Sequence, residues 1–203
     1  MAKDSSHRNH LREQVAQLAA RLIAEDGIQD YAQAKRKAAR QLRAEDSLCL
    51  PNNAEIENAL KTYHAIYHPA SQKDWVSRMR RHALDTMRLL ERFNPHLAGS
   101  VLSGTAAAHS DINLLLFSDS AKEVELYLLG KQIPYRVGVK RLKFGDEARM
   151  VPTVILEGEL GMATVEAAIL SEAEFRQGPR SPINGRPMAK ANSTQLETLI
   201  EAD

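Results

Sequence analysis

Residues 95–117, PHLAGSVLSGTAAAHSDINLLLF, decide the fold that the sequence predicts. A short apolar run ends at Gly99-Ser100, a loop of small residues follows, and a second apolar run begins after Asp111. Polar and apolar residues alternate at the start of the second run, as in a half-buried strand. Residues 96–102 and 111–117 are therefore predicted to be neighbouring strands of one sheet.

The loop between these two strands has the composition of a phosphate site. Gly99 and Gly104 let the backbone come close to a bound group, because glycine has no side chain. Asp111 begins the second strand, and Asn113 faces the same side two residues later. Backbone amides hold anions and carboxylate oxygens hold hard cations, so the pattern favours a phosphate bridged to a divalent metal.

This pattern resembles the signature of the nucleotidyltransferase superfamily, which includes DNA polymerase beta and the minimal nucleotidyltransferases. The family motif is Gly-Ser, a short spacer containing Gly, and then Ser-Asp-x-Asp followed by apolar residues. The resemblance covers about twenty residues, and it implies that Asp111 binds Mg²⁺. It also implies that the phosphates of a nucleoside triphosphate are bound by Gly99, Ser100, Gly104 and Ser110.

The sequence departs from the family motif at Asn113, where relatives carry a second metal-binding Asp. A neutral amide oxygen binds a hard cation more weakly than a carboxylate does. Glu157 follows the apolar run 154–156 and is a candidate third carboxylate, although an exposed glutamate at a strand end is the alternative. Asp111, Asn113 and Glu157 thus form the predicted metal-binding and catalytic set. Weak Mg²⁺ binding is expected, and tighter binding once a nucleotide is present.

Three functions are compatible with these residues. The first is a Mg²⁺-dependent enzyme that transfers a nucleoside monophosphate from a nucleoside triphosphate, such as ATP, to a hydroxyl acceptor. The second is a catalytically degenerate fold that binds a nucleotide or a protein. The third is nucleic-acid binding through basic helices at residues 35–43 and 78–88; solvated helix faces are the favoured interpretation, because only 5% of residues are aromatic.

Composition places the chain among globular proteins. Its 203 residues are 43% hydrophobic and 26% charged, and the net charge of +1 does not by itself predict nucleic-acid binding. The polar first ten residues precede no apolar signal region, and no apolar run has the length of a membrane span. Cys49 is the only cysteine, so we expect a cytoplasmic protein without internal disulfides.

Helical periodicity dominates the first half of the chain, in segments 10–25, 30–45, 53–67 and 73–93. These helices are predicted to bury Leu18, Leu22, Leu42, Leu60 and Leu90. In the second half we expect a helix over 120–132, a hairpin of strands over 134–144 and 148–157, and a last helix ending near residue 200; residues 164–169 fit a strand or a short helix. The prediction is an α+β fold: a helical unit over 1–94, then a mixed sheet of nucleotidyltransferase type over 95–203.

Overall fold

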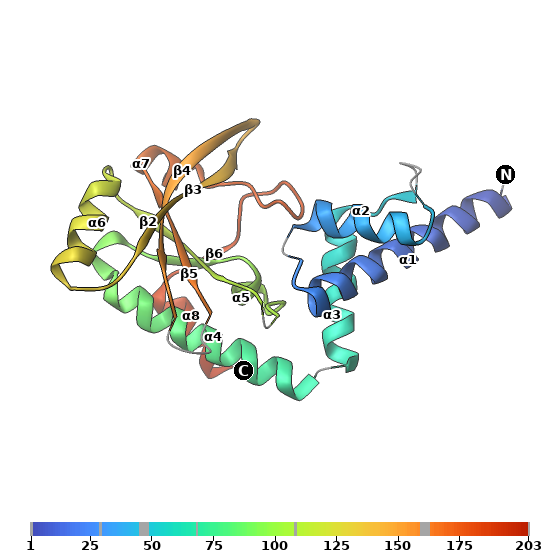
Figure 1. The fold of residues 1–203 in the computed structure, drawn as a ribbon, viewed down its shortest axis with the longest axis horizontal. Helices are drawn as coiled ribbons and strands as arrows, with labels where there is room; N and C mark the ends of the chain where they lie inside the picture. Colours follow the sequence, from blue (N-terminus) through green and yellow to red (C-terminus); the bar gives the residue numbers. More distant parts are fainter. Residues whose placement is uncertain are drawn as a thin grey trace. The chain divides into compact units, whose positions relative to one another are not determined.

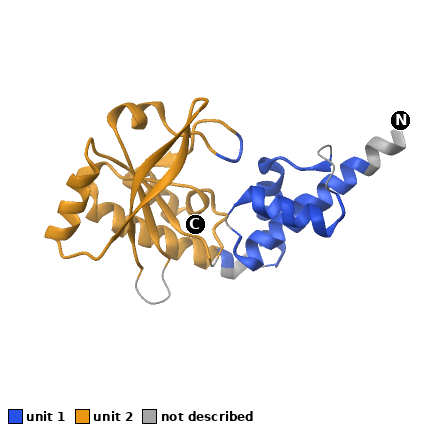
Figure 2. Ribbon diagram, turned by 45° about the horizontal axis from the view of Figure 1, so that its top comes forward, with its two compact units in different colours: residues 1–72, 182–184 blue, residues 73–181, 185–203 orange. Residues whose placement is uncertain are grey.

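The computed structural model describes residues 2–28, 30–44, 49–67, 69–107, 109–158 and 163–202. The chain forms two compact units (Figure 2). Unit 1 comprises residues 1–72 and 182–184, and unit 2 comprises residues 73–181 and 185–203. Unit 1 is helical and unit 2 combines helices with a sheet, so the predicted α+β class is confirmed.

Among the described residues, the helices that lie wholly within unit 1 are α1 (Ala2–Asp26), α2 (Tyr31–Gln41) and α3 (Asn53–Tyr67). Asp30 caps α2, because its carboxylate accepts hydrogen bonds from the amides of Ala32 and Gln33 at 2.6 and 3.1 Å. The side chain of Asn52 caps α3. Its Oδ1 accepts from the amide of Glu55 at 2.9 Å.

The core of unit 1 is built largely from small side chains. Alanines of α1 and α2 are fully buried and pack with Ile56 of α3. Two of the predicted core leucines, Leu18 and Leu42, are only partly buried and pack against this alanine-rich cluster. The other three, Leu22, Leu60 and Leu90, are buried as predicted.

One ion pair joins the first and third helices. The guanidinium of Arg12 donates to Glu55 through Nε at 2.9 Å and through a terminal nitrogen at 2.7 Å. This hydrogen bonding holds the pKa of Glu55 below its ordinary value. A carboxyl group whose pKa is lowered by folding stabilises the fold above its unfolded pKa, and it loses that contribution as pH falls through the folded pKa.

We therefore expect Arg12→Leu to flatten the acid limb of the stability curve. Wild type should lose free energy of unfolding more steeply than the variant as pH falls below about 4.3, the ordinary value for glutamate. Because the pair is partly exposed, the difference should stay below about 1 kcal/mol. Urea unfolding at pH 7, 5 and 3.5 measures it. Arg36→Leu, at an exposed position of α2, is the control and should follow wild type.

Unit 2 is organised around a six-stranded sheet with the order β3-β4-β5-β2-β1-β6 (Figure 1). β2 and β5 are parallel, and the other neighbouring pairs are antiparallel. The strands are β1 (His96–Ala98), β2 (Ile112–Phe117), β3 (Arg136–Phe144), β4 (Glu147–Leu156), β5 (Val165–Leu170) and β6 (Lys190–Ala191). The helical elements are α4 (Pro69–Leu89), η2 (Glu91–Phe93), α5 (Ser100–Ser103), α6 (Ala121–Gly130), α7 (Glu172–Gln177) and α8 (Ser193–Glu201).

The pairing of β1 with β2 confirms the central fold prediction. His96 lies opposite Leu115 and Ala98 lies opposite Asn113. The first strand is shorter than predicted, because Gly99 turns the backbone at φ +79° and residues 100–103 form the short helix α5. The hairpin of β3 and β4 is also confirmed, and the ambiguous segment 164–169 forms β5.

The two faces of the sheet carry different cores. One face packs under α4, α6 and α8, with fully buried Leu97, Ile112, Leu114 and Leu116. α4 shares this core, so the division between the units falls near residue 72, whereas the sequence expectation was a boundary near residue 94. The opposite face carries a smaller cluster to which the β3–β4 hairpin contributes. Within the described ranges, no helix combines the length and apolarity that a membrane crossing requires.

Candidate functional site

Two polar side chains lie side by side on the sheet face opposite α4. Strand register aligns Lys190 of β6 with Ala98 of β1, Ala98 with Asn113 of β2, and Asn113 with Glu166 of β5. Residues aligned across neighbouring strands point to the same face. Asn113 and Glu166 therefore stand side by side near the beginnings of two parallel strands.

The ammonium of Lys140 lies between these two side chains. Its Nζ donates to Asn113 Oδ1 at 2.5 Å, and it forms an ion pair with Glu166. The amide of Asn113 donates from Nδ2 to the backbone oxygen of Asp111 at 3.3 Å, which is consistent with Oδ1 facing the ammonium. The side chains of Lys140 and Glu166 are 31% and 24% exposed, so solvent reaches the pair only in part.

The shape of the β3–β4 hairpin brings Lys140 to this position. Gly138 lies opposite Thr153, and a Cβ added at Gly138 would lie 2.8 Å from Thr153 Oγ1. Further along the hairpin, Leu142 and Phe144 belong to the same buried cluster as Leu115. The far half of the hairpin therefore bends over the sheet and carries Lys140 toward Asn113.

The Gly-Ser turn, which directly follows β1, lies next to Asn113. A Cβ added at Gly99 would lie 3.4 Å from Asn113 Nδ2 and 3.7 Å from its Cγ. Ser100, partly buried, begins α5, and Gly104 ends it with φ +79°. The structure thus brings the glycine of the turn and the asparagine of the second strand into contact.

Arg80 of α4 stabilises this turn through hydrogen bonds to the backbone of α5. It is 5% exposed, and it donates from Nε to the backbone oxygen of Val101 at 3.1 Å and from Nη2 to that of Leu102 at 3.0 Å. The interpretation of Arg80 as part of a solvated basic face was therefore wrong. A signal was present in the sequence, because position 80 falls on the apolar stripe of α4 that includes Val76 and Ala83.

The loop after α5 is stabilised by a hydrogen bond from α4 and by one within the loop. Trp75 Nε1 donates to the backbone oxygen of Ala107 at 3.0 Å. The hydroxyl of Ser110 accepts from the amide of Ala107 at 2.9 Å, so this side chain closes a turn. The predicted role of Ser110 in phosphate binding stays a prediction.

The two carboxylates of the predicted metal set lie just outside their strands. Asp111 is partly buried and directly precedes β2, whereas Glu157 is 69% exposed and pairs with Arg136 at 3.1 Å. The strand position beside Asn113 belongs to Glu166 instead. Sequence reasoning missed Glu166, although a single carboxylate within the apolar run 165–170 was a usable signal once that run is identified as a strand.

The donor set fits a divalent cation poorly. Mg²⁺ prefers several oxygen ligands with carboxylates among them. Here one donor is a neutral amide, and the neighbouring carboxylate is already paired with an ammonium that contacts both. Across the described residues, no three or more His, Cys, Asp or Glu side chains form a group that could hold a metal ion.

The basic helix segments are partly engaged with neighbouring side chains. Arg88 pairs with Glu197 at 2.8 Å, Lys37 pairs with Asp26 at 2.7 Å, and the guanidinium of Arg78 lies 5.1 Å from the ring centre of Trp75. Several of the cations that suggested nucleic-acid binding therefore have partners within their own unit.

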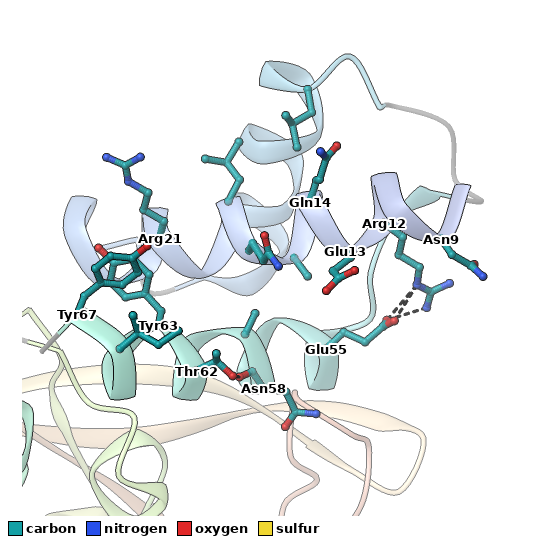
Figure 3. A pocket seen from close by; sticks show the side chains of 16 residues that line it. Asn9, Arg12, Glu13, Gln14, Arg21, Glu55, Asn58, Thr62, Tyr63 and Tyr67 are labelled. Atoms are coloured by element: carbon teal, nitrogen blue, oxygen red, sulfur yellow. Dashed lines mark hydrogen bonds and ion pairs between the residues drawn. The ribbon is translucent and has the colours of Figure 1, made fainter. Parts of the chain in front are cut away.

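Unit 1 contains a separate open groove of about 960 Å³, lined mainly by α1 and α3 (Figure 3). The Arg12–Glu55 pair lies at one end, and the rings of Tyr63 and Tyr67, 4.8 Å apart, lie at the other. The groove shares no residue with segment 95–117, so it is not part of the predicted site.

No protein-family model matches this chain, and no curated protein matches it. Among solved structures, one of Cid1, whose activity is described as RNA terminal uridylyl transferase, matches with a TM-score of 0.30 and 22% identity. The match covers 46% of this chain and spans 30% of the Cid1 chain. A likeness of this extent assigns no family, so function is argued from the site itself.

Proposed function

We propose that unit 2 is a nucleotidyltransferase-type domain that binds the phosphates of a nucleoside triphosphate without Mg²⁺-dependent transfer. The observation that carries the proposal is the position of the Lys140 ammonium, 2.5 Å from Asn113 Oδ1 and paired with Glu166. This function corresponds to the catalytically degenerate alternative, with a nucleotide as its ligand.

The fold type is supported by the close approach of the residues that form the motif. The Gly-Ser turn follows one strand, Asn113 lies on the antiparallel neighbour, and Gly99 approaches Asn113 closely. Glu166 occupies the next strand in register with Asn113. This is the position expected for the third acidic residue of the motif, which lies on a neighbouring strand.

A binding role is supported by charge. Phosphoryl-transfer enzymes use metal ions to neutralise the phosphates and to activate the attacking oxygen. Lysine is a compact cation that binds phosphate as a point charge, and it can neutralise a phosphate but cannot activate a hydroxyl as a metal does.

The test is a titration of the full-length protein with nucleoside triphosphates, in Mg²⁺ and in EDTA, together with a label-transfer assay. We expect saturable binding of similar affinity in both buffers, since the cation belongs to the protein. No label should pass to RNA, protein or small hydroxyl acceptors. The nucleoside without phosphates is the control ligand and should not bind.

Two results would contradict the proposal. Transfer of label that requires Mg²⁺ would establish the enzyme hypothesis, with a hydroxyl acceptor identified by the labelled product. Absence of binding to any nucleoside triphosphate would remove the nucleotide as ligand and leave the protein-binding alternative.

A further inference from the structure

We infer that Lys140 is a built-in cation that occupies the position of a divalent metal between Asn113 and Glu166. The inference rests on the proposed function only in taking a triphosphate as the ligand that the ammonium faces. The geometry of the ammonium and its two oxygen partners stands independently of that ligand.

Two side-chain oxygens converge on the Lys140 ammonium. Asn113 and Glu166 are aligned on adjacent parallel strands, and both direct an oxygen to Lys140 Nζ. An ammonium has three N–H donors. The hydrogen bonds described for this side chain use two of them, so the third is available for an oxygen of a bound phosphate.

The net charge of the cation and its two partner side chains is the same with a divalent metal and with the ammonium. A divalent metal between two carboxylates, one each at positions 113 and 166, would give a sum of zero. The ammonium with a neutral amide and one carboxylate also gives zero. Asn113 and Lys140 therefore match in charge. A singly charged ammonium balances one carboxylate, and the neutral amide at position 113 avoids a second, unbalanced negative charge.

The ammonium and a divalent cation exclude each other from this position. A divalent cation at this point would lie within a few ångströms of a fixed positive charge, and like charges that close repel strongly where solvent is partly excluded. Restoring aspartate at position 113 alone therefore should not create a metal site, because the ammonium remains. Removal of the ammonium and restoration of the carboxylate are both needed.

The experiment compares Mn²⁺ binding, by electron paramagnetic resonance and calorimetry without nucleotide, in wild type, Asn113→Asp, Lys140→Met and Lys140→Met/Asn113→Asp. We expect the double variant to bind Mn²⁺ at least about tenfold more tightly than wild type or Asn113→Asp, a gain that one added carboxylate and one removed ammonium provide. Lys143→Met, an exposed lysine pointing to the opposite face of β3, is the matched control and should behave as wild type.

Equal Mn²⁺ affinity in wild type and the folded double variant would overturn the inference, since Lys140 would then not exclude the metal. If Lys140→Met fails to fold, Lys140→Gln removes the charge, keeps hydrogen-bond donors and decides the same question. Because this experiment contains no nucleotide, its failure is separate from failure of the proposed function, which the nucleotide titration alone decides.

Discussion

Replacement of Gly99 by Val is expected to lower the free energy of unfolding by about 2–4 kcal/mol, through backbone strain and crowding. Gly99 has φ +79° and ψ −154°, a combination that glycine alone adopts readily. A Cβ added at Gly99 would lie 3.4 Å from Asn113 Nδ2. The two further methyl groups of valine must therefore displace the Asn113 side chain or the turn. Urea unfolding measures the loss.

The same substitution should weaken nucleotide binding at least about tenfold, because 1.4 kcal/mol of lost complementarity is sufficient for that change. Gly130→Ala is the control. Gly130 ends α6 with no heavy atom within 4 Å of an added Cβ, so alanine should leave binding unchanged and stability equal or slightly higher. A Gly99→Val protein as stable as wild type would show that the turn does not need glycine.

Replacement of Arg80 by Met is expected to lower the free energy of unfolding by about 2–3 kcal/mol, the range for hydrogen bonds to a buried charged group. Methionine fills much of the same volume but leaves the backbone oxygens of Val101 and Leu102 without their donor. The short helix α5 should loosen, and the Gly-Ser turn with it. Chemical denaturation together with amide hydrogen exchange at residues 99–105 measures both effects.

Arg81 provides the matched control for Arg80. It is the next residue of α4 and is exposed, so Arg81→Met should change stability by less than about 0.5 kcal/mol. Arg80→Lys should fall between the two, since lysine keeps the charge but not the planar fork that reaches two carbonyls. Equal stability of Arg80→Met and Arg81→Met would contradict the assigned role of Arg80.

The local conformation of the chain could be predicted from the sequence, because short-range patterns control it. Alternation of polar and apolar residues identified β2, and a glycine at position 99 marked the turn that precedes it. Helical spacing identified α1–α4. Each of these signals involves residues within a few positions of one another, where backbone geometry fixes which side chains share a face.

The composition of the site was decided by tertiary structure. Lys140 reaches Asn113 across 27 positions and Glu166 across 26, and Arg80 reaches Leu102 across 22. Two events make the first two contacts: β5 pairs in parallel with β2, and the β3–β4 hairpin bends over the face that they share. The sequence therefore predicted the strand β2 and the glycine turn that follows β1. Only packing of distant strands placed the Lys140 ammonium between Asn113 and Glu166, because strand order and hairpin curvature have no short-range signature.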